Sequence, residues 1–328
     1  MDSNGANEAP GEIVAGVDLG GTKIQTIVVR DGEVLGSARL PTPEDGADAV
    51  AVAIVDSVRS AVAASEVGDE ELTAVGMGAP GHVHEGVVSN SPNIVGMREP
   101  YPLGPTVSRG LDDVPVRIDN DVTVATLGEL ERGAGRRHAS FLSVFVGTGV
   151  GGGLVLDRAV WHGRGAAGEI GHMTVKPEGR RCGCGGHGHL EAYAGRASMQ
   201  AKAERLVAEG QHTVLFDLMA EHGKDRMTSG IIDRALKHGD AMTERLMGQA
   251  VWALGLALAS AQDLLDVEAV IVGGGLAERF GQPFVDRIAA EVQRSLFATH
   301  DPPTMVPAGL GDLSGAMGAA VLAGTAPA

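Results

Sequence analysis

The segment IVAGVDLGGTK, residues 13–23, joins an apolar run to a glycine turn, and this pairing returns twice along the chain. Phe141–Val146 leads into the glycine-rich Gly147–Gly153, and Val270–Val272 leads into Gly273-Gly274-Gly275. A strand that ends in backbone N–H groups without side chains around them can bind phosphate oxygens. One glycine turn alone can be only a tight turn, whereas three of them predict a nucleotide that is held from several sides.

The composition narrows the class of protein. The 328-residue chain is long enough for two domains, and it is 44% hydrophobic but only 3% aromatic, so small aliphatic side chains fill its cores. Its net charge of −16 argues against nucleic acid as a partner, because nucleic-acid binders present a basic face. The start MDSNGANEAP is unlike a signal peptide, and the most apolar helical run, Val251–Ala261, is too short to span a bilayer. We therefore expect a cytoplasmic protein that does not bind membranes.

Apolar periodicity and turn residues predict two similar halves. The first half contains expected strands at 13–18, 26–30, 34–40, 74–78 and 116–118 and expected helices at 45–64 and 122–132, with Asp31-Gly32 as a hairpin turn. The second half contains expected strands at 141–146, 154–156 and 269–272 and expected helices at about 190–208, 228–238, 240–265, 282–297 and 314–322. This predicts duplicated α/β domains: a disordered tail at 1–11, a first domain at 12–121 joined by a C-terminal helix at 312–328, and a second domain at 122–311.

The segment Gly147–Gly152 matches the G-x-G-x-x-G pattern of dinucleotide-binding proteins. That pattern must open a helix, whereas the following Gly153–Leu156 is typical of a strand. We therefore expect a β-hairpin whose tip presents bare backbone. The sequence also lacks G-x-x-x-x-G-K-[ST], which argues against a P-loop NTPase.

Acidic residues follow two of the expected strands. Asp18 ends the first strand, where its carboxylate either lies near Mg²⁺ and the transferred phosphate or caps its own loop. Lys23 either assists the phosphates or is solvated. In Asp119-Asn120-Asp121, where a strand meets a helix, at least one residue is an N-cap. Asp121 is the candidate general base, because phosphoryl transfer needs a group that takes the hydroxyl proton.

Further polar residues suit a polyol, whose hydroxyl groups both donate and accept hydrogen bonds. Asn93 in Ser91-Pro92-Asn93 is either a turn residue or a sugar contact of this kind, since a side-chain amide both donates and accepts hydrogen bonds. Glu169, His172 and Glu191 form a second polar set that flanks a cysteine-containing loop.

The two cysteines of the chain, Cys182 and Cys184, are one residue apart, a spacing that strains a disulfide and favours metal ligation. With His172 before them and His189 after them, they offer four nitrogen and sulfur ligands, which suits a closed, structural Zn²⁺ site. His187 is the alternative fourth ligand, and free thiols beside surface histidines are the alternative without metal.

These motifs occur in the order seen in the ROK family, which the chain resembles from about residue 13 to 323. The resemblance rests on seven segments: Asp18–Lys23, Gly78-Ala79-Pro80-Gly81, Asn120-Asp121, Gly147–Gly153, Glu169–His172, the Cys-x-Cys loop and Gly273–Gly275. The family groups bacterial sugar kinases and sugar-responsive repressors within the actin-like, hexokinase-like ATPase superfamily. The resemblance implies two actin-like (ribonuclease H-like) α/β domains around a central cleft, with the sugar between them.

By motif match, the resemblance also implies roles for single residues. Asp121 would be the catalytic base, and the sugar contacts would be Asn93, Asn120, Asp121, Glu169, His172 and Glu191. MgATP would contact Asp18, Gly20, Gly21, Thr22, Lys23, Gly147, Thr148, Gly149, Gly273, Gly274 and Gly275, with its adenosine end near the last three. The zinc ligands would be His172, Cys182, Cys184 and His189, with one ring nitrogen of His172 for each of its two roles.

The sequence departs from the family pattern at two places. The family loop reads Cys-x-Cys-x-x-x-x-Cys, and His189 stands at its last position here, which would make a Cys2His2 site. Asp121-Val122-Thr123-Val124 replaces a segment in which small Ala and Asn are usual, and this leaves the candidate base in place.

The expected function is ATP-dependent phosphorylation of the 6-hydroxyl of a hexose, with D-glucose as the first candidate. N-acetylmannosamine, N-acetylglucosamine, fructose and mannose are alternative substrates, and polyphosphate is an alternative donor that the acidic charge disfavours. A sugar-responsive repressor is the alternative outside enzymes, and about 12 residues before the first strand leave no recognition helix for it. The family resemblance implies a homodimer or homotetramer.

Overall fold

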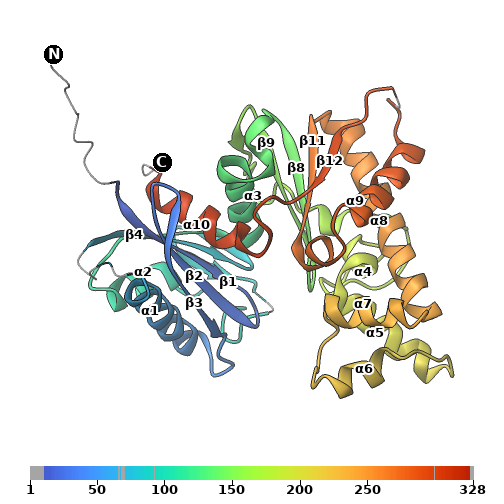
Figure 1. Cartoon of the computed structure of the whole chain (residues 1–328), viewed down its shortest axis with the longest axis horizontal. Helices are drawn as coiled ribbons and strands as arrows, with labels where there is room; N and C mark the ends of the chain where they lie inside the picture. Colours follow the sequence, from blue (N-terminus) through green and yellow to red (C-terminus); the bar gives the residue numbers. More distant parts are fainter. Residues whose placement is uncertain (1–10, 66, 68–70, 92, 299, 326–328) are drawn as a thin grey trace, which may run out of the picture. The chain divides into compact units, whose positions relative to one another are not determined.

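The computed structural model describes residues 11–65, 67, 71–91, 93–298 and 300–325 (Figure 1). The chain forms two compact units: unit 1 comprises Met1–Gly128 and Gly315–Ala328, and unit 2 comprises Glu129–Ser314. The predicted tail at 1–11 lies, apart from Gly11, outside the described residues. The predicted domain division after Asp121 falls at the start of helix α3 (Asp121–Arg132), whose first turns belong to unit 1.

Unit 1 is built on a five-stranded sheet of order β3-β2-β1-β4-β7. Its strands are β1 (Ile13–Leu19), β2 (Lys23–Arg30), β3 (Glu33–Pro41), β4 (Leu72–Ala79) and β7 (Val116–Asn120). The first three strands form an antiparallel meander, and β4 and β7 continue the sheet parallel to β1. The predicted meander and its Asp31-Gly32 turn are confirmed, and both turn residues have positive φ, as a two-residue hairpin requires.

Helix α1 (Ala47–Ala63) packs on β2 and β3 of this sheet. Its buried Val50, Ile54 and Val58 recur every four residues, which is the spacing of one helix face. The sequence pattern missed helix α2 (Leu103–Gly110) and the hairpin of β5 (His82–His84) and β6 (Val87–Ser89). These elements are short, and Gly and Pro interrupt α2, so no apolar periodicity marks them.

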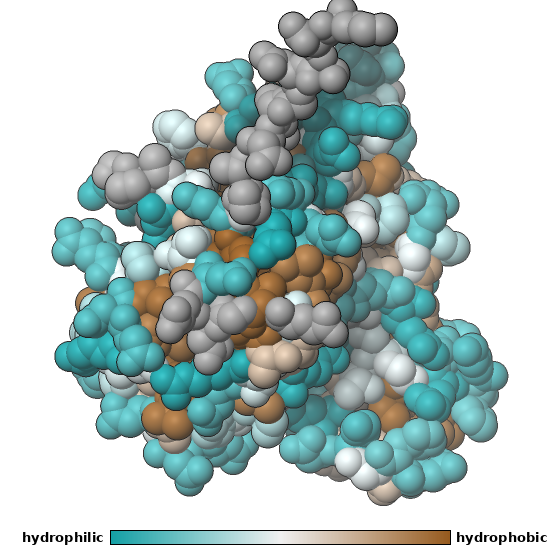
Figure 2. All heavy atoms as spheres, turned by 60° about the vertical axis from the view of Figure 1, so that its left-hand side comes forward, coloured by the Kyte–Doolittle hydropathy of each residue, from teal (hydrophilic) through white to brown (hydrophobic). Residues whose placement is uncertain are grey.

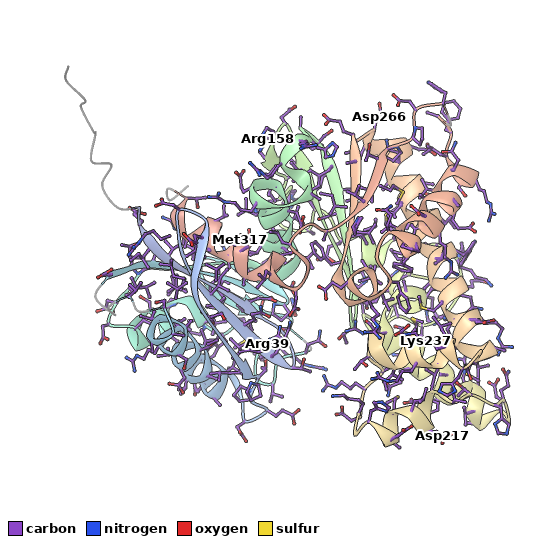
Figure 3. The ribbon with its side chains drawn as sticks, in the orientation of Figure 1. Arg39, Arg158, Asp217, Lys237, Asp266 and Met317 are labelled. Carbon is purple, nitrogen blue, oxygen red and sulfur yellow. The ribbon has the colours of Figure 1, made fainter. Side chains whose placement is uncertain are left out.

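Helix α10 (Ser314–Gly324) packs directly on β1 and β4. A Cβ atom at Gly16 would collide with the carbonyl oxygen of Ala316, and one at Gly76 with that of Ala319. These two glycines therefore let the helix backbone approach the sheet. Met317, labelled in Figure 3, is a buried residue of this helix. A third glycine, Gly318, lies against Val124 of α3, which explains why the first turns of α3 belong to unit 1.

Unit 2 repeats the same sheet plan in the order β10-β9-β8-β11-β12. Its strands are β8 (Phe141–Val146), β9 (Val150–Leu156), β10 (Ala159–Val160), β11 (Ala269–Gly273) and β12 (Thr304–Pro307). Strands β8, β9 and β10 are antiparallel, and β11 and β12 are parallel to β8. Val146 pairs with Val150, so the segment after Gly147 is a hairpin, as predicted, and not the start of a nucleotide-binding helix. The predicted duplication is confirmed.

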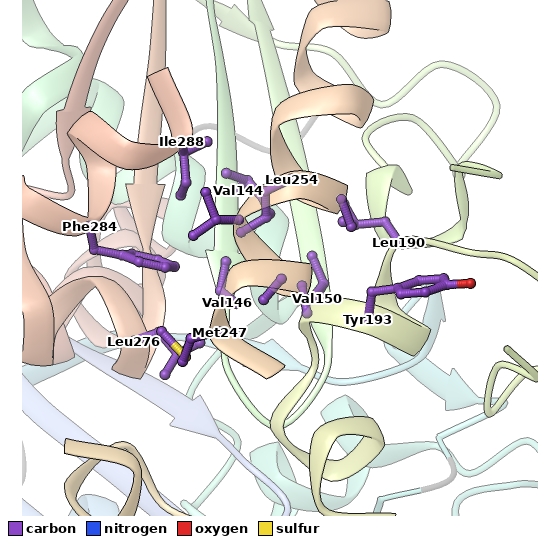
Figure 4. Close-up of a cluster of buried hydrophobic side chains, with 14 of the residues drawn as sticks. Val144, Val146, Val150, Leu190, Tyr193, Met247, Leu254, Leu276, Phe284 and Ile288 are labelled. Carbon is purple, nitrogen blue, oxygen red and sulfur yellow. The ribbon is translucent and has the colours of Figure 1, made fainter. Parts of the chain in front are cut away.

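The helices of unit 2 are α4 (Glu191–Ala194), α5 (Arg196–Ala208), α6 (Leu215–Glu221), α7 (Ser229–Lys237), α8 (Ala241–Leu265) and α9 (Gly274–Ser295). The predicted helix at 190–208 is divided at Gly195, whose backbone is extended. The predicted helix at 282–297 begins earlier, at Gly274, and changes direction at Gly281 with φ 58. Figure 4 shows the unit 2 core, in which Val144, Met247 and Phe284 bring β8, α8 and α9 together.

The face of the molecule that Figure 2 shows carries hydrophilic side chains over most of its area, and hydrophobic side chains gather near its centre. Among the residues that the structure describes, no helix is both long enough and apolar enough to cross a membrane.

Candidate active site

The first glycine turn of unit 1 lies between β1 and β2. The Gly20 N–H donates to the Lys23 carbonyl at 2.9 Å, and the Thr42 hydroxyl donates to the Gly20 carbonyl at 2.7 Å. One of the expected bare N–H groups is therefore used inside the turn. Lys23 begins β2, where its Nζ donates to Gln25 Oε1 at 3.3 Å.

Asp18 lies at the carboxyl end of β1, beside the first turn of α10. A Cβ atom at Gly315 would lie 2.7 Å from Asp18 Cγ, so only a residue without a side chain fits there. The half-buried carboxylate therefore lies close to the beginning of a helix, where backbone N–H groups favour negative charge.

Asn93 is exposed, and it lies against the same glycine turn. A Cβ atom at Gly21 would lie 3.2 Å from the Cβ atom of Asn93. The structure thus brings a predicted sugar contact and a predicted phosphate contact together within unit 1.

The Asp119-Asn120-Asp121 segment joins β7 to α3. Asn120 is the capping residue, because its Oδ1 accepts from the N–H groups of Val122 at 3.0 Å and Thr123 at 3.2 Å, while its Nδ2 donates to Gly81 O at 3.2 Å. The Asp121 carboxylate is half-buried, and its Oδ1 accepts from the Val122 N–H at 2.9 Å. Of the three candidates for the N-cap, Asn120 thus has that role, which leaves the Asp121 carboxylate at the first residue of the helix.

In unit 2, Glu191 lies against the glycine hairpin. Its Oε2 accepts from the Val150 N–H at 3.0 Å, and Gly149 lies so close that any Cβ atom there would collide with this carboxylate. The other carboxylate oxygen, Oε1, is 3.6 Å from Cys182 Sγ. Glu191 therefore connects the predicted phosphate hairpin with the cysteine loop.

The third glycine segment is a strand-to-helix junction, because Gly273 ends β11 and Gly274 begins α9 with φ 79. The sequence pattern predicted a turn here and did not reveal a helix N-terminus. Backbone N–H groups at a helix N-terminus are also suited to binding an anion, and the nucleotide contact here stays a prediction.

Arg196 was not predicted from the sequence. Its guanidinium donates to Ser229 Oγ at 3.0 Å and to Thr148 Oγ1 at 3.5 Å, and it lies beside Gly275. Burial lowers the pKa of this guanidinium, and the Glu278 carboxylate partly offsets that effect. The sequence around Arg196 contains no motif that would predict its role, because Ser229 and Thr148, its hydrogen-bond partners, lie on separate elements.

The cysteine loop gathers the four predicted metal ligands. The ligand atoms of His172, Cys182, Cys184 and His189 all lie within 4.8 Å of one another. Cys184 Sγ is 3.2 Å from His189 Nδ1, and Cys182 Sγ is 3.9 Å from His172 Nδ1. Such separations suit four ligands around one tetrahedral ion. His187 does not belong to this cluster, and its backbone pairs with that of Arg181.

His172 presents its two ring nitrogens to different groups. Nδ1 faces Cys182, whereas Nε2 lies 3.8 Å from Glu169 Oε2. This geometry is compatible with the two roles that the resemblance implies for His172. Burial raises the pKa of the Cys182 thiol to about 11, the Cys184 side chain and the Glu191 carboxylate also raise it, and a hydrogen bond with the Cys184 backbone lowers it.

Several known proteins are similar to this chain over most of its length. A model of the ROK family matches residues 14–326. Glucokinase from Streptomyces coelicolor is 35% identical over 319 residues, which cover 95% of this chain and 97% of that protein. N-acetylmannosamine kinase from Vibrio cholerae is 28% identical over 296 residues, which cover 88% of this chain and 92% of that protein.

A solved structure is similar over nearly its whole length. The ROK family glucokinase from Streptomyces griseus, in complex with glucose and AMPPNP, is 33% identical, with a TM-score of 0.80 over 95% of this chain and 99% of that one. Together with the two repeated sheets, this confirms the predicted class of two actin-like α/β units. The family model, the relatives and the shared fold agree that the chain belongs to the ROK family.

Proposed function

We propose that this chain is an ATP-dependent hexose kinase that phosphorylates the 6-hydroxyl of D-glucose. The observation that carries the proposal is the Asp121 carboxylate, oriented at the first residue of α3 by the Val122 N–H at 2.9 Å. The glucokinase relative at 35% identity and the solved neighbour with glucose and AMPPNP support it, because AMPPNP has the shape of ATP.

In the proposed reaction, Asp121 takes the proton of the sugar hydroxyl while the hydroxyl oxygen attacks the terminal phosphate of ATP, and ADP leaves. The N–H groups of Gly20 and Gly147 bond inside their own turns, so other backbone N–H groups of the Gly20–Thr22 and Gly147–Gly149 turns would stabilise the charge that develops on the phosphate. Arg196 would position the second turn through Thr148.

The bound groups fit residues of this chain. Asp18 offers the oxygen ligand that Mg²⁺ prefers, and Mg²⁺ when bound neutralises phosphate charge. The sugar contacts that we propose are Asn93, Asn120, Asp121, Glu169, His172 and Glu191. Asn120 uses its amide oxygen for the cap and one N–H of its amide nitrogen for the Gly81 carbonyl, so the second N–H of that nitrogen is the donor proposed for a sugar oxygen.

The substrate is tested by measuring ADP release with MgATP across glucose, mannose, fructose, N-acetylglucosamine and N-acetylmannosamine. We expect the highest kcat/KM with glucose. A preference for N-acetylmannosamine, which the Vibrio cholerae relative makes the second candidate, would change the substrate but keep the reaction class. A lack of turnover with every sugar would contradict the kinase proposal. Replacing ATP by polyphosphate in the same assay tests the donor.

We further propose a structural Zn²⁺ site held by His172, Cys182, Cys184 and His189. The chemistry of the donor set and the 4.8 Å span of its ligand atoms support the fit. Such an ion would hold the loop before Glu191 in place and would take no part in the chemical step.

The metal site predicts two different outcomes for two histidines of one loop. His189→Gln is expected to lose bound zinc and to unfold at a lower temperature, because metal binding and folding are coupled. His187→Gln is the matched control and is expected to keep both its zinc and its unfolding midpoint. Elemental analysis of the purified variants and thermal unfolding measure both effects. Equal zinc content in the two variants would rule out this ligand set.

We also propose a homodimer or homotetramer, which the family resemblance supports. Light scattering coupled to size exclusion measures the mass directly.

A further inference from the structure

Unit 2 carries two adjoining cavities outside the residues of the proposed active site. One cavity of about 580 Å³ and one of about 210 Å³ share Lys202 and Gln249 as lining residues, so they adjoin in one region of the surface. We call it the basic groove, and its cationic residues are Lys176, Arg180, Arg181, Lys202, Arg205 and Arg245.

The positive charge of the basic groove is largely uncompensated. Glu178 is its one acidic lining residue, in a chain whose net charge is −16. Arg205 pairs with Glu209 at 3.8 Å, both exposed, and such a pair contributes little. Within the described part of the chain, no ion pair joins a carboxylate to Arg180, Lys202 or Arg245.

The cations also disfavour one another. Burial lowers the pKa of the Lys202 ammonium, and the charges of Arg205, Arg180 and, least, Arg245 lower it further, while the Glu209 carboxylate raises it. Lys202 lies on α5 and Arg245 on α8, and both line the smaller cavity, so like charges from two helices lie close together there. An anion bound between them would remove this repulsion.

Part of the basic groove is held in a fixed conformation. The Arg180 guanidinium lies 4.6 Å from the centre of the Tyr193 ring and bonds to the Gln249 side chain and the Ala192 carbonyl. Figure 4 shows the Tyr193 ring at the edge of the core with its hydroxyl directed away from Val150. Arg245 donates to Gln211 Oε1 at 2.7 Å. Ordered cations lose less conformational entropy when they bind a ligand.

We propose that the basic groove binds a small anion that carries two or more phosphate groups. Guanidinium groups match phosphate oxygens with paired hydrogen bonds, and several cations in one region of the surface favour a multiply charged ligand. The volumes suit a small molecule, and the strongly negative chain as a whole disfavours a long nucleic acid.

Binding in the basic groove is expected to affect the proposed active site through α4. Tyr193, which contacts Arg180, lies two residues after Glu191 on this short helix. This part of the inference rests on the proposed function, and it predicts a change in the KM for the sugar when the groove is occupied. The binding measurement below does not depend on activity.

The experiment titrates inorganic tripolyphosphate into the full chain by calorimetry, without Mg²⁺. Lys202→Gln/Arg245→Gln is expected to weaken binding about 10-fold or more, because two charge-assisted contacts to the anion are lost. The matched control is Lys224→Gln/Arg226→Gln, which removes the same charges from an exposed loop of the same unit. It is expected to bind within about twofold of the unchanged chain.

Further titrations identify the chemistry of the ligand. Orthophosphate is expected to bind much more weakly than pyrophosphate or tripolyphosphate, and ADP tests a nucleoside source of the same diphosphate group. Unchanged unfolding midpoints of both double variants show that the fold is intact. Equal tripolyphosphate binding by the groove and control variants would overturn the proposal, since binding would then occur only at another site. A change of oligomeric mass in the groove variant, with unchanged tripolyphosphate binding, would overturn it too.

Discussion

Asp121→Asn is expected to lower kcat for sugar phosphorylation by about 10²–10⁴-fold, which is the usual contribution of a general base. The asparagine amide has the same shape and can still accept the Val122 N–H at 2.9 Å, so the start of α3 stays capped. It cannot take a proton from the sugar hydroxyl at neutral pH. Steady-state kinetics with glucose and MgATP measure the loss, and calorimetry measures sugar binding separately.

The control for this variant is Asp113→Asn, which removes the same charge from an exposed position of unit 1. Asp113 has φ 64, a left-handed conformation that asparagine tolerates well. We expect unchanged kcat and KM for this control. Near-normal turnover of Asp121→Asn, with unchanged sugar binding, would show that another group is the base.

Glu129→Gln is expected to destabilise the protein by about 3 kcal/mol, because this fully buried carboxylate accepts four hydrogen bonds. Oε2 accepts from the N–H groups of Ala134 and Gly309, both at 2.8 Å, and Oε1 accepts from Leu310 N–H at 3.0 Å and the Ser314 hydroxyl at 2.8 Å. Glutamine has only one acceptor oxygen, so its NH₂ group would face two groups that are themselves donors.

The position of these bonds explains the size of the effect. The chain enters unit 2 at Glu129 and leaves it after Ser314, so one side chain holds both ends of the unit. Urea unfolding measures the change, and Glu131→Gln, at an exposed position of the same helix, is the matched control. A loss of stability no larger than that of the control would mean that the site rearranges and satisfies the N–H groups in another way.

Much of the fold was predictable because it depends on local patterns. Short apolar runs and the Asp31-Gly32 turn predicted the meander of unit 1, and a strand after Gly153 predicted the β8–β9 hairpin. These signals are local because the apolar residues that mark a strand, and the turn residues that end it, lie within a few positions of one another in the sequence. Helix α2 and the β5–β6 hairpin escaped prediction, since they are too short to show a period.

The candidate site also has a part that the sequence predicted and a part that it did not. The motif residues Asp18, Asp121 and Glu191 follow strands or begin helices, so their places were visible in the sequence. Which residue caps α3 was not visible, because Asn120 and its neighbours are all able to cap. The clustering of His189 rather than His187 with the cysteines also depends on how the loop folds.

The sequence by itself therefore determined the family, the repeated α/β plan and the residues that form the motifs. Only the tertiary structure decided the partners of Arg196, the four bonds of Glu129 and the meeting of Lys202 with Arg245. The physical reason is distance along the chain: a motif records contacts among neighbouring residues, whereas these side chains meet groups that folding brings from separate helices and loops.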